Sequence, residues 1–291
     1  LSSEQHEDLK SKLEKIQKAT GQKINSYKVI NAGGESLVIE VNGVWIFRFP
    51  RNQILKDKTK EQLNFIASFS KVSPLQLPAP RYIEQDFIGY KKIPGKPLYK
   101  TNLKKLTEQE RVKIAEQIGL FLKTLHGYKD KHIDFDTGYL IMRKEDYKTC
   151  PKIIAKYLTI AEQGALNIKL RKIANNPLNF EKPATIIHGD FYFNNIIWDS
   201  KRKIITGVID WSNAGIGVPA MDFIMLADFN SGINDKFLKN ILKYYGTNGD
   251  NLFYQIKENA IIDVMNWFWT FYKEKKSKGI ARMIKKLKKI L

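Results

Sequence analysis

Two carboxylates and a carboxamide lie at spacings that suit phosphoryl transfer. Asp190 and Asn195 belong to the segment HGDFYFNN (188–195), and Asp210 follows fifteen residues later in GVIDW. Apolar and β-branched residues flank both segments, so we expect these polar side chains at the ends of short strands. Phosphoryl transfer needs a carboxylate beside the attacking hydroxyl, and oxygen ligands for Mg²⁺, whose charge offsets that of the phosphates. The three residues can supply these parts.

The elements that must position these residues change in character near residue 95. Before it, a helical stretch (4–19) precedes two β-rich segments, 24–33 and 35–50, with a turn predicted at Asn42-Gly43. A helix is expected over 56–69, and strand character returns over 81–93. After Pro97 the periodicity predicts helices at 107–126, 151–161, 234–245, 252–272 and near the terminus, with two short apolar segments between them. The pattern indicates an α+β protein, with a small antiparallel-sheet lobe joined to a larger helical lobe and a cleft between them.

Composition excludes several classes of protein. The 291 residues are 43% hydrophobic and 27% charged, which is typical of a folded globular chain and not of a disordered one. The most apolar stretch, 261–272, contains Asp263 and Asn266, so no transmembrane segment is expected. The N-terminus shows no secretion signal, and a single cysteine, Cys150, favours a reducing compartment. We therefore expect a cytoplasmic protein, acting as a monomer.

The formal charge of +19 is concentrated near the end of the chain. The segment 273–289 contains nine Lys and Arg residues and only one carboxylate, Glu274. Apolar residues recur in this part of the chain at helical spacing. This predicts an amphipathic helix whose basic face is in solvent, with contact to acidic lipid or RNA as the alternatives. Because no aromatic residues are interleaved with the lysines, no specific nucleic-acid partner is expected.

The same motifs resemble those of the aminoglycoside phosphotransferases, which share the bilobal protein-kinase-like fold. HGDFYFNN resembles the family's catalytic-loop pattern H-G-D-x-x-x-x-N, and GVIDW resembles its metal-binding I-D-W segment. VNGVWIFRFP is similar to the third strand of the small lobe, FIGYKKIPGKPL to the connection between the lobes, and IGLFLKTLH to the helix behind the catalytic loop. The resemblance is strongest to the aminoglycoside 2''-phosphotransferase branch, over roughly residues 24–272. It implies a nucleotide-binding lobe at 1–93 and a helical lobe with the catalytic loop and substrate site at 94–291.

Carried over by position, the resemblance makes Asp190 the catalytic carboxylate that accepts the proton of the substrate hydroxyl. Asn195 and Asp210 would ligate Mg²⁺, and ATP or GTP would be the phosphoryl donor. His188 and Asp222 would support the loop, although Gly217-Val218-Pro219 stands where the family commonly has G-D-P. His188 could instead serve as a base, because histidine titrates near neutrality. We favour the supporting role, and we interpret His126 as a packed core histidine.

The nucleotide side of the cleft would be formed by the first part of the chain. Arg48 stands where the family usually has a lysine on the phosphates, and an arginine can grip two phosphate oxygens. Glu61 would be its ion-pair partner, although Glu61 could be an exposed helix residue and Arg48 a cation on the sheet surface. Glycines let backbone N–H groups approach phosphates closely. Further contacts to the nucleotide are predicted from the loop between the first strands and from the backbone of the hinge, the connection between the lobes. These residues are Gly33, Gly34 and Ser36 in the loop, and Tyr90, Lys92 and Ile93 in the hinge.

The sequence also offers candidate residues for binding the acceptor, the compound that receives the phosphoryl group. Aminoglycosides are polycations and need local carboxylates, for which Asp228 and Asp263 are the first candidates, with Trp267 as a stacking wall. Asp235 and Glu258 are weaker candidates. We therefore expect a Mg²⁺-dependent kinase that transfers the γ-phosphoryl group of ATP or GTP to an aminoglycoside hydroxyl. The alternatives are a kinase of the same fold acting on a macrolide, a sugar derivative or choline, and a non-catalytic protein that binds membrane or RNA.

Overall fold

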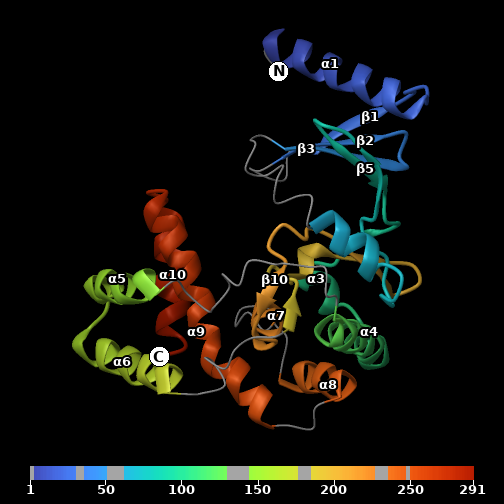
Figure 1. The fold of residues 1–291 in the computed structure, drawn as a ribbon. Helices are drawn as coiled ribbons and strands as arrows, with labels where there is room; N and C mark the ends of the chain where they lie inside the picture. Colours follow the sequence, from blue (N-terminus) through green and yellow to red (C-terminus); the bar gives the residue numbers. More distant parts are fainter. Residues whose placement is uncertain are drawn as a thin grey trace.

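The computed structural model describes residues 3–30, 36–50, 62–129, 144–175, 185–226, 235–246 and 250–291. Within these ranges the chain forms a small sheet-rich part near the N-terminus and a larger, mainly helical part (Figure 1). The expected α+β class and bilobal arrangement are confirmed. None of the described helices is long and apolar enough to cross a membrane.

The N-terminal sheet has five antiparallel strands in the order β1-β2-β3-β5-β4. The turn between the second and third strands is made by Asn42 and Gly43, whose φ angles of 52° and 68° fit the predicted Asn-Gly hairpin. Asn42 Oδ1 also accepts hydrogen bonds from the backbone N–H groups of Asn25 and Ser26, which ties the approach to the first strand to this turn. The strands are β1 (Tyr27–Ile30), β2 (Ser36–Val41), β3 (Trp45–Pro50), β4 (Pro80–Ile83) and β5 (Ile88–Lys91).

A long N-terminal helix, α1 (Ser3–Thr20), covers this sheet and lies at the upper end of the view in Figure 1. Leu9 and Ile16 of the helix are buried in one cluster with Ile39, Phe47 and other apolar residues of the strands. This cluster is separate from the main core, so the small sheet has a core of its own.

The larger part combines helices with two small sheets that carry the catalytic segment. The sheets have the orders β6-β8-β9 and β10-β7. Their strands are β6 (Lys96–Pro97), β7 (Thr185–Ile187), β8 (Ile196–Asp199), β9 (Ile204–Val208) and β10 (Gly215–Gly217). The described helices are α3 (Lys100–Leu103), α4 (Glu108–Gly127), α5 (Lys144–Ile154), α6 (Ile160–Asn175), α7 (Ala220–Leu226), α8 (Asp235–Tyr245), α9 (Asp250–Lys273) and α10 (Ser277–Lys288).

One helix prediction is wrong. The stretch 151–161, expected as a single helix, contains the end of α5, a 3₁₀ turn at Ala155–Tyr157 and the start of α6. Thr159 and Glu162 explain the break, because the Thr159 N–H donates to Glu162 Oε2 at 2.7 Å and Thr159 Oγ1 accepts from the Glu162 N–H at 3.3 Å. This reciprocal capping box starts a new helix.

The segment before the hinge packs with the larger part of the molecule. Residues 62–69 are helical, and the Phe65 and Phe69 rings lie 5.4 and 6.1 Å from the Trp211 ring. Farther along, the Gln76 N–H donates to Thr206 O and Gln76 O accepts from the Val208 N–H, which joins this segment to β9. The predicted boundary between the two lobes at 93/94 stays a prediction, and this segment connects them.

Candidate active site

The catalytic segment begins where β7 ends, at His188 and Gly189. Gly189 has φ of +73°, and a Cβ placed on it would lie 2.0 Å from the Asn213 carbonyl oxygen. The chain can therefore make this turn, which delivers Asp190 to the cleft, only with glycine.

Replacing Gly189 with alanine is expected to lower the melting temperature and to reduce activity. The methyl group requires both a strained backbone and a displacement of the Asn213 carbonyl, each of which costs roughly 1–3 kcal/mol. Gly164→Ala is the matched control, because Gly164 is exposed on α6 and a Cβ there meets nothing within 4 Å. Equal thermal melting of the Gly189→Ala variant and wild type would show that the turn tolerates a side chain.

Asp190 is held by the amide of Asn195. Asn195 Nδ2 donates to Asp190 Oδ2 and to the Asp190 carbonyl oxygen, both at 2.8 Å. Burial, followed by the negative charge of Asp210, raises the pKa of Asp190 from 3.8 to about 6. A carboxylate with this pKa is deprotonated at neutral pH and is a better proton acceptor than an ordinary aspartate.

Both ring nitrogens of His188 are used inside the protein. The Asp190 N–H donates to His188 Nδ1 at 3.3 Å, so the ring proton lies on Nε2, which donates to the Ile209 carbonyl at 3.1 Å. Burial lowers the pKa of this histidine, and its ring lies 4.6 Å from the Trp211 ring. The neutral, fully engaged imidazole fits the supporting role and not that of a base.

Asp222 is a fully buried carboxylate that binds the same turn. Its Oδ2 accepts from the His188 N–H and its Oδ1 from the Gly189 N–H, both at 2.9 Å. His126 Nε2 lies 3.1 Å from Oδ2, while His126 Nδ1 lies 3.0 Å from the Tyr245 hydroxyl. The Gly217-Val218-Pro219 departure therefore leaves the bracing of the loop intact, and His126 is a hydrogen-bonded core histidine.

Asp210 and Arg48 form an ion pair between the small sheet and the segment that follows β9. Asp210 follows β9 with φ of +63°, and its Oδ1 lies 3.7 Å from an Arg48 guanidinium nitrogen on β3. Arg48 also hydrogen-bonds the side chain of Tyr90, whose pKa is raised by burial. Ser212 Oγ donates to Asp210 Oδ1 at 3.1 Å. The positive φ of Asp210 places its backbone in the left-handed region, which residues other than glycine rarely adopt. Such backbone conformations are concentrated at functional sites.

Tyr90 and Lys92, at the predicted connection between the lobes, already make contacts within the small sheet. Tyr90 pairs with Ile46 on one side and Pro80 on the other, so its backbone belongs to the sheet, while its side chain reaches Arg48. The predicted backbone contact of Tyr90 with a purine stays a prediction. The Lys92 N–H donates to Val44 O at 2.8 Å and its Nζ pairs with Glu40 at 2.9 Å, so this amide is already used.

Of the remaining nucleotide-side predictions, only some fall on described residues. Ile93 is buried beside β9, and its side chain would contact a Cβ placed on Gly207. Ser36 opens β2 opposite Pro50. Gly33, Gly34 and Glu61 lie outside the described residues, as does Asp228 on the acceptor side.

A cavity of about 520 Å³ opens beside Asp190. Its walls come from the catalytic segment, α9 and α10, and they are formed by Asp190, Tyr192, Asn194, Trp267, Arg282, Met283 and Lys286. The volume is within the usual range for a small-molecule site. Among the predicted acceptor contacts, Trp267 lines this cavity.

Asp263 does not line the cavity and serves another purpose. Its Oδ1 accepts from the Tyr192 hydroxyl at 2.5 Å, and the Trp267 Nε1 donates to the same hydroxyl at 2.9 Å. Burial and the charge of Asp263 raise the pKa of Tyr192. Asp263 thus links α9 to Tyr192 of the catalytic segment, and its role as a direct acceptor contact stays a prediction. The weaker candidates Asp235 and Glu258 form ion pairs with Lys257 and Lys172.

The predictions from sequence missed Tyr192, Asn194, Arg282 and Lys286 as cavity residues. Tyr192 and Asn194 were visible inside HGDFYFNN, where they alternate with the buried Phe191 and Phe193. Arg282 and Lys286 belong to the C-terminal helix, whose basic face is predicted to lie in solvent. No local sequence signal distinguishes them from the other basic residues of that helix.

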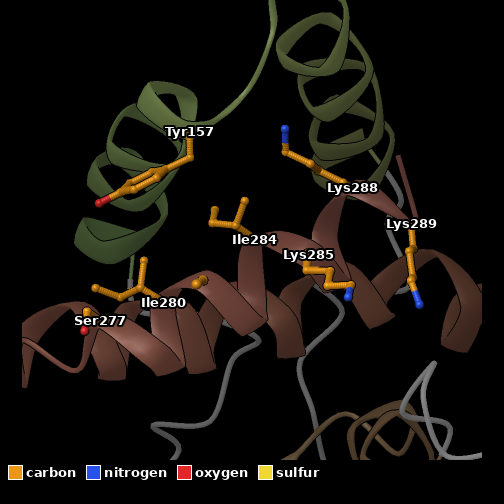
Figure 2. A pocket seen from close by; sticks show the side chains of 8 residues that line it. Tyr157, Ser277, Ile280, Ile284, Lys285, Lys288 and Lys289 are labelled. Atoms are coloured by element: carbon orange, nitrogen blue, oxygen red, sulfur yellow. The ribbon is translucent and has the colours of Figure 1, made fainter.

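A second cavity, of about 690 Å³, lies on the other side of α10 (Figure 2). Ile280 and Ile284 point from α10 toward Tyr157, and lysines border the opening (Figure 2). No carboxylate is among the residues that line it, which are Tyr157, Ser277, Ile280, Ala281, Ile284, Lys285, Lys288 and Lys289. It therefore lacks a group that could accept a proton from a hydroxyl.

The oxygen atoms near Asp190 are suited to a Mg²⁺ ion that is also bound by the phosphates of a nucleotide. In the part of the chain that the structure describes, no cluster of three or more His, Cys, Asp or Glu residues could hold a metal. Asp210 and the side-chain amide oxygen of Asn195, which accepts from Asn194 Nδ2 at 3.2 Å, instead offer hard oxygen donors close to Asp190. Mg²⁺ is commonly bound by one or two protein oxygens, with substrate phosphates and water completing its coordination.

A small antiparallel sheet with an arginine at the cleft, joined to a helical part that presents Asp190, Asn195 and Asp210, defines a kinase-like phosphotransferase. The sequence profile of the phosphotransferase enzyme family matches residues 26–254, and the chain belongs to this family. The predicted family and enzyme class are thus confirmed. A curated relative, the uncharacterized protein YcbJ of Bacillus subtilis (strain 168), is 20% identical over 224 residues, which are 74% of this chain and 72% of the relative.

Solved structures of antibiotic phosphotransferases share the fold. The GDP and kanamycin complex of APH(2")-IIia matches with a TM-score of 0.82 and 18% identity, covering 96% of this chain and 98% of the other. The gentamicin complex of APH(2")-IIa has a TM-score of 0.75 and 22% identity, with 99% and 96% covered. Macrolide 2'-phosphotransferase MphH from Brachybacterium faecium has a TM-score of 0.71 and 15% identity, with 97% and 98% covered. At these identities the similarity establishes the fold.

Proposed function

We propose that this protein transfers the γ-phosphoryl group of ATP or GTP to a hydroxyl of a small molecule. The observation that carries the proposal is Asp190, a carboxylate of raised pKa that is oriented by Asn195 and borders a cavity of ligand size. Similar structures are a GDP complex of APH(2")-IIia and an ATP ternary complex of APH(2")-IIa, which supports a nucleotide donor.

The proposed reaction is a direct displacement. The acceptor oxygen forms a bond to the γ-phosphorus, the bond from that phosphorus to the β,γ-bridging oxygen breaks, and the electron pair leaves with the nucleoside diphosphate. Asp190 takes the proton of the acceptor hydroxyl. Arg48 binds the phosphates from the small sheet, and Asn195 both orients Asp190 and joins Asp210 as an oxygen ligand for Mg²⁺. When bound, Mg²⁺ neutralises charge on the phosphates.

Aminoglycosides are the acceptor class that the similar structures favour, because two of them are complexes with kanamycin and gentamicin. A macrolide or a sugar derivative is the second candidate, supported by the macrolide phosphotransferase fold match. The test is release of nucleoside diphosphate, measured with ATP and GTP across aminoglycosides, macrolides and sugar derivatives. Release that depends on an acceptor and on Asp190 supports the proposal, and its absence with every acceptor contradicts it.

Removing Asp210 should raise the Mg²⁺ requirement. In Asp210→Ala the metal loses a carboxylate ligand, so the Mg²⁺ concentration for half-maximal turnover should rise by about tenfold or more. Ser212→Ala removes only the hydroxyl that donates to Asp210 and is the matched control, with a smaller expected change. Superimposable Mg²⁺ titrations for wild type and Asp210→Ala would refute the metal assignment.

A further inference from the structure

The cavity of Figure 2 is a groove with one apolar end and one basic end. Its α10 residues recur every three or four positions from Ser277 to Lys288, so they form one stripe along the helix, roughly 17 Å long. The apolar end is formed by Tyr157, Ile280, Ala281 and Ile284. The basic end is formed by Lys285, Lys288 and Lys289 (Figure 2). This polarity matches a ligand that has a hydrocarbon chain and an anionic head.

The apolar end of the groove is held in shape by the core beneath it. Met283 and Leu287 of α10 are buried, with 2% and 1% of their surfaces exposed, in a cluster shared with α5, α6 and α9. The Tyr157 ring lies 5.9 Å from the ring of buried Phe268 on α9, edge to face. Both walls are thus fixed by packing, and a ligand need not order the helix before it binds.

The basic end of the groove is open to solvent and able to bind an anion. Lys285, Lys288 and Lys289 are exposed, and no carboxylate lines the groove. Lys288 Nζ lies 3.1 Å from Glu162 Oε2 on α6, whereas Lys285 and Lys289 form no ion pair within the described part of the chain. These two ammonium groups can therefore donate charge-assisted hydrogen bonds to a ligand without first leaving a carboxylate.

The isoleucines of the groove are recessed below its lysines. Ile284 is 8% exposed and Ile280 is half-buried, whereas the lysines at 285, 288 and 289 are exposed. A helix that binds a bilayer inserts protruding apolar side chains into it, which recessed isoleucines do not provide. A hollow of about 690 Å³ instead has the size of a small-molecule site. The groove is therefore suited to one ligand molecule and not to a membrane surface.

We infer that this groove binds a single long-chain amphiphile whose head is a carboxylate or a phosphate. The chain lies along Tyr157, Ile280 and Ile284, and the head contacts Lys285 and Lys289. The site lies across α10 from the acceptor cavity, and its occupancy does not require phosphoryl transfer. Since each buried methylene group lowers Kd by about fourfold, the groove should prefer long chains.

Binding can be tested by calorimetric titration with monomeric probes, each kept below its micelle concentration. The probes are dodecanoate, dodecyl phosphate, octanoate, acetate and dodecyltrimethylammonium. We expect one-to-one binding of dodecanoate or dodecyl phosphate, at least about tenfold tighter than that of octanoate and dodecyltrimethylammonium, and no measurable binding of acetate. The bound probe should also raise the melting temperature, which distinguishes binding to the folded protein from unfolding by a detergent.

Variants locate the effect. Ala281→Trp fills the apolar end from an exposed position and should weaken dodecanoate binding by about tenfold or more. Lys285→Ala combined with Lys289→Ala should remove the preference for an anionic over a cationic head. Lys275→Ala combined with Lys278→Ala is the matched control, because it removes two exposed lysines of the same segment that do not line the groove. This control should bind as wild type does, and thermal melting of each variant confirms folding.

Four results would overturn the inference. Neither anionic dodecyl probe binds with one-to-one stoichiometry, or the cationic probe binds as tightly as the anionic ones. The third is unchanged affinity in a folded Ala281→Trp variant together with equal binding of octanoate and dodecanoate. The fourth is binding to phosphatidylglycerol vesicles without binding of either monomeric anion, which would make the basic helix a membrane-contact surface.

Discussion

Asp190→Asn is expected to lower kcat by a factor of about 10²–10⁴ while the protein stays folded and binds nucleotide. The amide has the volume of the carboxylate but cannot accept the proton of the acceptor hydroxyl. Turnover is measured as acceptor-dependent release of nucleoside diphosphate, and nucleotide affinity is measured by titration. Near-wild-type kcat in this variant would exclude Asp190 as the proton acceptor.

The control for this substitution is Asp263→Asn, which removes a neighbouring carboxylate that does not line the cavity. Its loss of kcat should be far smaller. Asp263 contributes to the raised pKa of Asp190, so this control should also lower the pH at which activity falls.

The raised pKa predicts how activity and stability change with pH. Since Asp190 titrates at about 6, kcat/KM of wild type should fall as the pH decreases through 6, as the carboxylate becomes protonated. The proton is held more tightly in the folded state, so this group contributes stability below pH 3.8 that is lost as the pH rises through 6. At pH 8 Asp190→Asn should therefore be more stable than wild type, by about 2 kcal/mol, with the difference shrinking toward pH 4. An equal difference in melting temperature at both pH values would contradict this account.

Asp222→Ala should be the most destabilising of the substitutions considered. The carboxylate is fully buried and accepts from two backbone N–H groups of the catalytic turn. Its removal leaves these donors and the His126 ring without an acceptor in a site closed to water. Each unsatisfied group costs roughly 1–3 kcal/mol, so the free energy of unfolding should fall by about 3–5 kcal/mol. Urea unfolding of wild type and variant measures this difference.

Asp199 provides a matched control for Asp222. Its Oδ1 also accepts from two backbone N–H groups, those of Lys201 and Arg202, but in an exposed turn. Water can replace the carboxylate there, so Asp199→Ala should lose much less stability. Equal losses for the two variants would show that burial of Asp222 does not determine its contribution. Asp222→Asn, which keeps one acceptor oxygen, should be intermediate.

The parts of the fold that depend on local sequence could be predicted from it. Asn42-Gly43 specifies the hairpin because both residues tolerate positive φ, and the strand-flanked polar residues at 188–195 and 210 do meet at one site. The helix break at Thr159 was also encoded locally, as a capping box, and was overlooked.

The acceptor side could not be predicted in the same way. Asp263 and Trp267 are residues of suitable type on one helix, but only packing shows that both hydrogen-bond to Tyr192, which lines the cavity. Arg282 and Lys286 share their residue types with many neighbours in the basic helix. Their position at the cavity depends on how α10 packs on α9, an arrangement of elements that charge patterning does not encode.

Four of the seven residues that line the cavity beside Asp190 follow the region that the family profile matches. The family profile ends at residue 254, whereas Trp267, Arg282, Met283 and Lys286 follow it. The proposed catalytic residues and much of the proposed acceptor wall thus occupy different parts of the chain. We therefore expect substitutions in the last two helices to alter which compound is phosphorylated while the catalytic loop stays unchanged. Relatives that share HGDFYFNN and GVIDW can therefore have diverged in acceptor, and comparing their last two helices is the way to sort them by substrate.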